Sequence, residues 1–317
     1  MMIIIIQMSI QLKDHLDYLD EVDKIITGGQ INRLINYTNF SLCRFFRYGL
    51  RKIIRINNKK IIKHVINNMT SIDYSDYENY SLIHILTLYS ENTNLLNYLI
   101  EKYRFDLEIK TNYYSKPIHY AFRNKKVKNI KLLIDKGVDL EAQKINGMRP
   151  VHLACEEGLV EIVKILIDKG VDLEAQESNS MRPIHYACTN RSWEIVEILV
   201  NADVNINSKD DYGMPIHYAC LQGSFETIKL LITRGANIES KNISNWNSVH
   251  LACANGTFEI IKYLLIRDID LNSRINIYNG NVVDYGIDDL LMLNDKLTTD
   301  NKTELLQIIA KKKAEFN

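Results

Sequence analysis

The chain has no apolar run long enough to cross a membrane, although 46% of its 317 residues are hydrophobic. Its apolar start, from Met1 to Ile6, lacks the basic region and the cleavage site of a signal peptide, so we do not expect secretion. The 39 Lys and Arg side chains balance 39 Asp and Glu side chains, so net charge favours no class of partner. These absences predict an intracellular, cytoplasmic protein without a transmembrane segment.

Motifs of the common enzyme classes are also missing. The sequence contains no Cys-x-x-Cys pair, no Walker-type glycine loop, no dinucleotide-binding fingerprint and no Gly-x-Ser-x-Gly elbow. We therefore expect no enzyme, no cofactor and no catalytic residue. The eight histidines and five cysteines are the remaining candidates for chemistry, and most of them follow a repeat.

Proline is scarce, and its four copies mark one recurring motif. Each begins a Pro-Ile-His or Pro-Val-His sequence, at Pro117, Pro150, Pro183 and Pro215. Two related copies of the motif, which contain His84 and His250, lack the proline. The six histidines of the motif are 35, 33, 33, 32 and 33 residues apart: His84, His119, His152, His185, His217 and His250. A period in this range predicts stacked repeats that each contact only their neighbours.

Residues 147–180 indicate how one repeat unit folds. Pro150 fits the first turn of a short helix, where no amide hydrogen bond is lost, and Gly158 ends that helix in a left-handed conformation. A second helix is predicted over residues 161–169, because its apolar residues recur at helical spacing. Gly170 ends this helix, and an extended stretch with a tight turn leads to the next unit.

The repeat gives most histidines and cysteines a structural role. Corresponding residues of stacked helices lie about 8–10 Å apart, so neighbouring histidines cannot share a metal ion, and we predict no metal site. Each of the six imidazoles is expected to hydrogen-bond the turn backbone. Four cysteines share one repeat position and are too far apart for disulfides: Cys155, Cys188, Cys220 and Cys253. We predict reduced, buried thiols, which suit an intracellular compartment.

Helix, turn, helix and turn, with Pro-Ile/Val-His-x-Ala opening the first helix and Leu-Ile-x-x-Gly-x-Asp closing the second, resembles the ankyrin repeat family. The resemblance covers residues 79–280 in six clear units. It implies an all-α solenoid of helix-turn-helix units with short hairpin-like turns and degenerate capping repeats at both ends. It also implies a non-enzymatic scaffold that binds another protein. The wealth of Asn, Ile, Lys and Tyr resembles ankyrin proteins of large amoeba-infecting viruses or parasitic protists, and a viral member would occupy the host cytoplasm.

Some residues depart from the family pattern. Lys125 and Arg191 replace the glycine between the two helices, and Asp203 and Asp268 replace the glycine after the second helix. A left-handed conformation costs such residues about 1 kcal/mol each, so their repeats are expected to be less stable. The family's threonine before proline is also replaced, by Lys116, Arg149, Arg182, Met214 or Asn247. These replacements put the usual cap of the first helix in question.

Three further segments flank the clear repeats. Residues 1–36 are expected to contain an amphipathic helix, and residues 37–78 a degenerate basic capping repeat. Residues 281–317 are expected to hold a last worn copy of the motif, with Asp284 at the histidine position, followed by capping helices.

The basic character of residues 24–72 supports two interpretations, since ten Lys or Arg residues occur there without any acidic residue. Arg44, Arg47, Arg51 and Arg55 recur at helical spacing and predict one basic stripe. The stripe is either the solvated face of a cap or a site for the phosphates of nucleic acid or an acidic membrane surface. The second interpretation makes an electrostatic binder the alternative function.

In the architecture of this family, the turn tips and first helices line a concave surface where partners bind. Aromatic, Met and Arg side chains are enriched in the cores of protein interfaces. For a monomeric chain and a protein partner of unknown identity, we predict binding through nine tip residues: Tyr113, Tyr114, Met148, Arg149, Met181, Arg182, Tyr212, Met214 and Trp246. The alternative is that some of them only stabilise the neighbouring tip.

Overall fold

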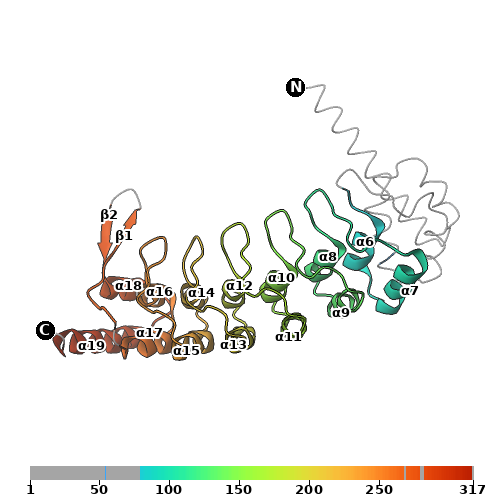
Figure 1. The fold of residues 1–317 in the computed structure, drawn as a ribbon. Coiled ribbons are helices and arrows are strands. Elements are labelled where there is room, and N and C mark those ends of the chain that lie inside the picture. The colour runs from blue at the N-terminus through green and yellow to red at the C-terminus, as the bar shows by residue number, and fades with distance from the viewer. Residues whose placement is uncertain (1–53, 55–78, 268, 279–281, 316–317) are drawn as a thin grey trace, which may run out of the picture. The chain divides into compact units, whose positions relative to one another are not determined.

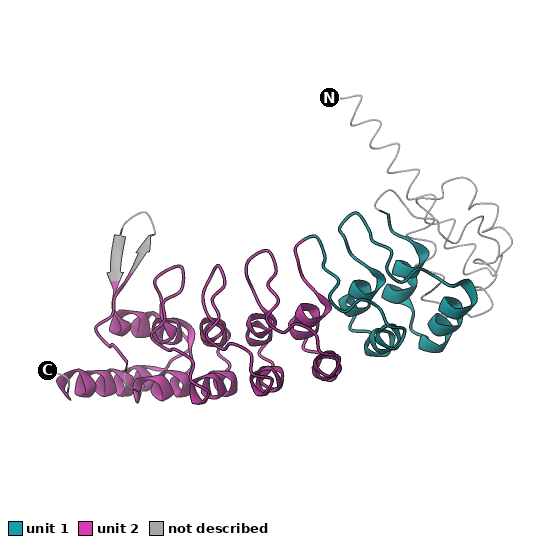
Figure 2. Cartoon of the chain, in the orientation of Figure 1, with its two compact units in different colours: residues 1–145 teal, residues 146–317 magenta. Residues whose placement is uncertain are grey.

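The computed structural model describes residues 54, 79–267, 269–278 and 282–315. The segments 1–36 and 37–78 therefore lie outside the described residues, apart from the buried Ile54, and so does the basic stripe of Arg44, Arg47, Arg51 and Arg55. The chain divides into two compact units, residues 1–145 and 146–317 (Figure 2). The predicted repeat array contributes to both units.

The described part of the first unit contains two helix pairs. α6 (Leu82–Tyr89) pairs with α7 (Thr93–Tyr103), and α8 (Pro117–Arg123) pairs with α9 (Val127–Asp135). The first helices, α6 and α8, pack on each other, and so do the second helices, α7 and α9 (Figure 1). Fully buried apolar side chains such as Leu96, Ile118 and Ile130 fill the space between the elements.

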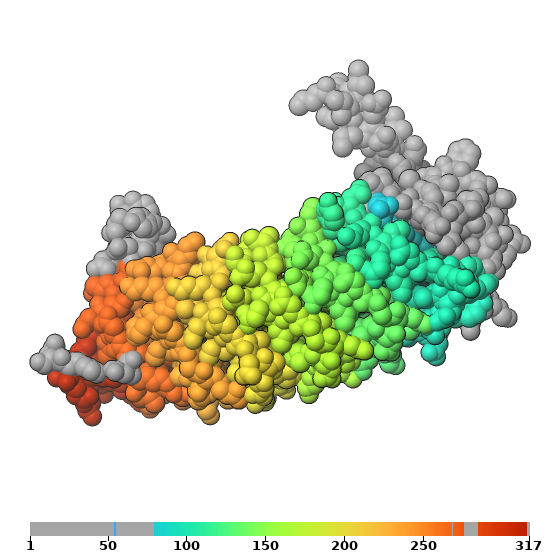
Figure 3. All heavy atoms as spheres, viewed as in Figure 1, coloured from blue at the N-terminus to red at the C-terminus, as the bar shows by residue number. Residues whose placement is uncertain are grey.

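The second unit continues with five helix pairs in its described part. The first helices are α10 (Pro150–Glu156), α12 (Pro183–Thr189), α14 (Pro215–Gln222), α16 (Ser248–Asn255) and α18 (Ile287–Leu293). The second helices are α11 (Val160–Asp168), α13 (Trp193–Asn201), α15 (Phe225–Thr233), α17 (Phe258–Leu265) and α19 (Thr299–Glu315). Each helix packs on its counterpart in the next pair, and successive repeats of this unit form contiguous bands in the space-filling view (Figure 3). Among the described residues, no helix combines the length and apolar character needed to span a bilayer.

The predicted all-α solenoid is confirmed, with one local exception. β1 (Ile275–Tyr278) and β2 (Val282–Tyr285) form an antiparallel hairpin where the other repeats have a short tip loop. The expected register of the last motif copy is therefore wrong, because Asp284 lies in β2 and α18 begins only at Ile287. Asp289 takes the histidine position instead, since its Oδ2 accepts the N–H of Gly286 at 2.8 Å.

The helix ends follow from the local sequence. Four first helices begin with proline, whose missing N–H is tolerated in the first turn. Gly158 and Gly170 have φ values of 71° and 72°, as the pattern predicts. Lys125, Arg191 and Asp203, which replace such glycines, have φ values of 51°, 62° and 58°, so the predicted left-handed conformations are confirmed. Asp268 lies outside the described residues.

The α18 and α19 helices follow the clear repeats at the C-terminal end of the second unit, where two helical segments were predicted. The Asn294 side chain follows α18 and donates hydrogen bonds to the carbonyls of Cys253 and Gly256, at 3.0 and 2.9 Å. Leu305 and Ile309 of α19 are buried. These contacts attach the last helix pair to the repeat before it.

Candidate functional site

Each first helix from α6 to α16 carries a histidine that joins the helix to the loop after the same helix pair. The Nδ1 of His152 accepts the N–H of Arg149 at 3.1 Å, and its Nε2 lies 2.9 Å from the carbonyl oxygen of Ala175. Corresponding contacts are made by His84, His119, His185, His217 and His250. A backbone N–H can only donate, so Nδ1 is unprotonated and Nε2–H donates to the carbonyl.

Both ring nitrogens of these histidines thus have hydrogen-bond partners within the protein. Burial also favours the neutral ring, because it disfavours the charged form. Burial lowers the pKa of His119 to about 4. Burial is also the main cause that lowers the pKa of His152, His185, His217 and His250. Within the described residues, no three His, Cys, Asp or Glu side chains are grouped as a metal ion would require. The role of the imidazoles is therefore structural, because their hydrogen bonds attach the loops to the first helices.

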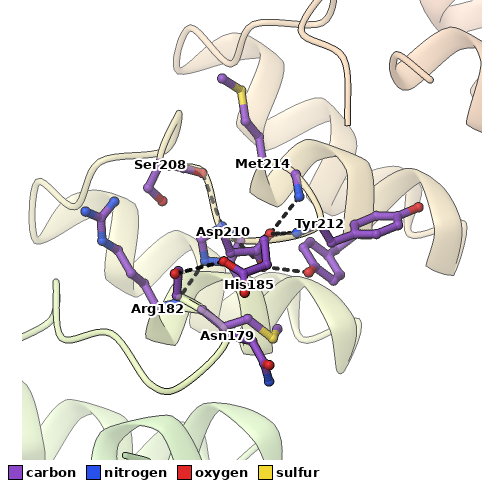
Figure 4. Close-up of polar contacts among 12 residues, drawn as sticks. Asn179, Arg182, His185, Ser208, Asp210, Tyr212 and Met214 are labelled. Atoms are coloured by element: carbon purple, nitrogen blue, oxygen red, sulfur yellow. Dashed lines mark hydrogen bonds and ion pairs between the residues drawn. The ribbon is translucent and has the colours of Figure 1, made fainter. Parts of the chain in front are cut away.

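One loop of the second unit buries a carboxylate that the sequence did not point to. The Asp210 side chain is 1% exposed, and its Oδ2 lies 4.0 Å from Nε2 of His185 (Figure 4). Its Oδ1 accepts the N–H groups of Tyr212 and Gly213 at 2.9 and 2.6 Å, and its Oδ2 accepts the Tyr218 hydroxyl at 2.6 Å. These hydrogen bonds offset the cost of burying the charge. The only sequence signal was the missing residue before the next helix.

The turns that end the loops between repeats are called tip loops below: residues 110–115, 143–148, 176–181, 209–213 and 241–246. One backbone hydrogen bond joins each tip loop to its neighbour within a unit. In the first unit, the N–H of Ile145 donates to the carbonyl of Tyr113 at 2.9 Å. In the second, Ser178 donates to Asn146 at 3.0 Å, Asp211 to Asn179 at 3.2 Å and Ile243 to Tyr212 at 2.8 Å. These bonds hold neighbouring tips in a fixed register.

The nine predicted partner-binding residues differ in their exposure. Tyr113 and Tyr114 are 50% and 55% exposed. Partial exposure is found for Arg149, Met181, Arg182, Tyr212 and Trp246. Met148 and Met214 are buried, at 5% and 7%, so the expectation that they are exposed is wrong. Both stand at the base of a tip loop, next to the first helix, and not at its end.

The basic residues before proline form ion pairs with the loop before or the loop after their own helix pair. Arg149 Nη1 lies 3.1 Å from Asp172 Oδ2, and Arg182 Nε lies 3.1 Å from Glu174 Oε2. Lys116 pairs with both loops, through Glu108 before α8 and Asp139 after α9. A long basic side chain thus ties the start of the first helix to a neighbouring loop. It stands at the position where the family's threonine would cap the helix. A partner of Arg149 or Arg182 has to compete with these carboxylates.

Two exposed tip residues were missed by sequence reasoning. Ile145 is 65% exposed and Ile243 is 74% exposed. Both are the third residue of a tip loop, a position that the other loops fill with the polar residues Asn112, Ser178 and Asp211. Isoleucine resembles a core residue when it is considered alone. Alignment of the tip loops would have revealed an apolar side chain at a polar position.

Stacked helix pairs, histidine-fixed loops and hydrogen-bonded tips define the class of helical repeat solenoids. Residues 140–210 and 202–275 match the family model for ankyrin repeats, described as three copies. These parts of the chain are therefore ankyrin repeats, as the resemblance of the sequence implied. Ankyrin repeats generally serve as protein–protein interaction modules and are typically non-enzymatic.

Solved ankyrin repeat domains have the same fold. The human ASB11 ankyrin repeat domain is 19% identical, with a TM-score of 0.59 over 69% of this chain and 97% of that chain. The ankyrin repeat domain of Bcl-3, a unique member of the IkappaB protein family, is 20% identical, with a TM-score of 0.52 over 72% of this chain and 98% of that chain. At this identity the likeness concerns the fold alone. No curated protein matches the sequence.

Proposed function

We propose that this chain is a non-enzymatic scaffold that binds another protein through its tip loops and the neighbouring face of its first helices. The observation that carries the proposal is the exposure of large apolar side chains at the tips: Tyr113, Tyr114 and Ile145 in the first unit and Ile243 in the second. Aromatic and aliphatic anchors of this kind contribute much of the binding energy in protein interfaces.

The rigidity of the tips supports the same proposal. The hydrogen bond from Ile145 to Tyr113 fixes two neighbouring tip loops before any partner arrives. Little conformational entropy is lost when a prepared surface binds, so more of the contact energy contributes to affinity. Polar side chains at the ends of the first helices, such as Glu156, Thr189 and Asn255, are exposed and provide a polar rim.

We further propose an intracellular, monomeric protein. Cys155, Cys188, Cys220 and Cys253 are free and buried, as the sequence predicted. Free thiols at repeated positions suit a reducing compartment.

The alternative function, electrostatic binding through residues 24–72, stays a prediction based on ten basic residues without an acidic one. It predicts that binding to a polyanion falls steeply with salt. Replacement of Arg44, Arg47, Arg51 and Arg55 by Gln would then abolish this binding. Binding that is insensitive to salt, or unchanged in this variant, contradicts the alternative.

The scaffold proposal is tested by quantitative affinity purification of the full chain from the cells that express it. The tip variant carries Tyr113→Ser, Tyr114→Ser and Ile145→Ser. The matched control carries Trp193→Ser and Ile266→Ser, which remove exposed apolar side chains outside the tips. We expect a partner that is retained by the control and lost by the tip variant, while both keep the helical content of the unmodified chain. Equal recovery of every partner by both variants overturns the proposal.

A further inference from the structure

We propose that the tip surface of the first unit binds an acidic peptide segment that also carries an apolar side chain. This inference rests on the proposed function and names the chemistry of the partner. The surface is an open hollow between the tip loop at residues 110–115 and residues 139–145 of the same unit. Its lining includes Lys110, Tyr114, Lys144 and Ile145.

The charge of this surface comes from two lysines at its rim. Lys116 also lines the hollow, but its Nζ is neutralised by Asp139 and Glu108, at 2.8 and 2.5 Å. Among the described residues, Lys110 and Lys144 have no carboxylate within ion-pair distance. The Lys110 ammonium lies 5.9 Å from the centroid of the Tyr114 ring. A carboxylate of the partner would therefore meet two lysines without a direct ion pair among the described residues, although Lys110 attracts Asp139 over a longer distance.

Apolar side chains lie beside these cations. Tyr114 and Ile145 are 55% and 65% exposed and line the same hollow, and Tyr113 is 50% exposed on the same tip loop as Tyr114. An apolar side chain of a peptide that covers them removes apolar area from water, which favours binding. Carboxylates flanking a leucine or an aromatic residue match this combination of groups.

The same combination recurs independently in the second unit. Lys209 and Lys241 are exposed there, close in sequence to the partly exposed Tyr212 and the exposed Ile243. The tip loop at residues 176–181 instead presents the polar Gln176, Ser178 and Asn179. A pairing of lysine with an aromatic and an aliphatic side chain is therefore a property of particular tips and not of every repeat.

The hollow suits a peptide better than a nucleic acid. Its lining mixes the lysines with Asp139 and Glu141, so it offers isolated cations and no continuous basic stripe along which a run of phosphates could bind. A peptide can place isolated carboxylates at the lysines and keep uncharged groups elsewhere.

The test is selection of short random peptides displayed on phage against the immobilised full chain. We expect the selected peptides to be enriched in Asp and Glu together with Leu, Phe or Trp. A selected acidic peptide should lose about tenfold in affinity, or about 1.4 kcal/mol, for the variant Lys110→Glu/Lys144→Glu. It should also bind Ile145→Ser more weakly. The control Lys128→Glu/Lys229→Glu changes two exposed lysines of α9 and α15 and should bind as tightly as the unmodified chain.

The outcomes separate this inference from the scaffold proposal. Selected peptides that are not acidic, or that keep their affinity for Lys110→Glu/Lys144→Glu, overturn the inference; the scaffold proposal stands if Ile145→Ser weakens them. Peptides unaffected by every tip variant contradict both. A labelled single-stranded oligonucleotide that binds through the same lysines and displaces the peptide assigns the surface to nucleic acid and overturns the inference. Absence of any enrichment over the starting library also overturns it.

Discussion

The hydroxyl of Tyr218 donates a hydrogen bond to Oδ2 of Asp210 over 2.6 Å and joins α14 to the carboxylate buried in the preceding tip loop. The same tyrosine ring packs edge-on against His185, with ring centroids 5.7 Å apart. Tyr186 packs against His152 in the same way, at 5.8 Å. The two tyrosines therefore share a ring environment and differ in what their hydroxyls contact.

Replacement Tyr218→Phe is expected to destabilise the protein by about 1–3 kcal/mol, because a buried carboxylate loses one of its donors. The control is Tyr186→Phe, which keeps the corresponding ring packing and is expected to change stability by less than about 0.5 kcal/mol. Urea unfolding followed by circular dichroism measures both. Equal effects of the two replacements would show that the contact with Asp210 does not matter.

The buried histidines predict a loss of stability in acid. The pKa of His119 is about 4 in the folded chain, below the ordinary value of about 6.5. The unfolded state thus binds more protons between these values, and stability falls as the pH drops below about 6.5. In NMR spectra of the folded chain with labelled histidine, the His119 ring signals should stay at their neutral position from pH 8 to pH 5. A midpoint near pH 6.5 contradicts this account.

Residues other than glycine that adopt the left-handed backbone conformation are sites for a stabilising replacement. Arg191 has a φ of 62° between α12 and α13. Arg191→Gly should stabilise the chain by about 0.5–1 kcal/mol, because glycine adopts this conformation without steric cost. Arg191→Ala removes the same side chain, keeps the Cβ and should give no such gain. Thermal or urea unfolding distinguishes the two, and equal stability of both variants would show that backbone strain at Arg191 is negligible.

The cysteines of the repeats should be inert in the folded chain. Burial raises the pKa of Cys220 to about 12 and also raises the pKa of Cys155, Cys188 and Cys253. The replacement Cys43→Ser leaves only these four thiols. We expect none of them to react with an aromatic disulfide reagent before unfolding and all four to react in guanidinium. Rapid reaction of the folded chain would contradict their burial.

Features set by the repeat period were predictable from the sequence. Each repeat provides several aligned copies of one position, so Lys125, Arg191 and Asp203 could be recognised as substitutes for glycine, and their left-handed conformations followed. The helix pairs were predictable for the same reason, because proline and glycine recur at the helix ends.

Features set by a single loop were not predictable. The exposure of Met148 and Met214 depends on where each tip loop turns, and the base of the loop is covered although its end is not. The hairpin of β1 and β2 changes the repeat spacing. The residue at the histidine position of the last motif copy is therefore Asp289 and not Asp284. The burial of Asp210 depends on a hydroxyl from the next helix, which no local pattern encodes.

The central claim, that the tips contact a protein partner, is tested most directly by photo-crosslinking. A photoreactive amino acid is placed at position 113 or 145 in the tips, or at position 128 or 229 on the second helices. After irradiation in the cells that express the chain, we predict crosslinks to the same protein from positions 113 and 145 and none from positions 128 and 229. Crosslinks to that protein from positions 128 and 229 only would contradict the account.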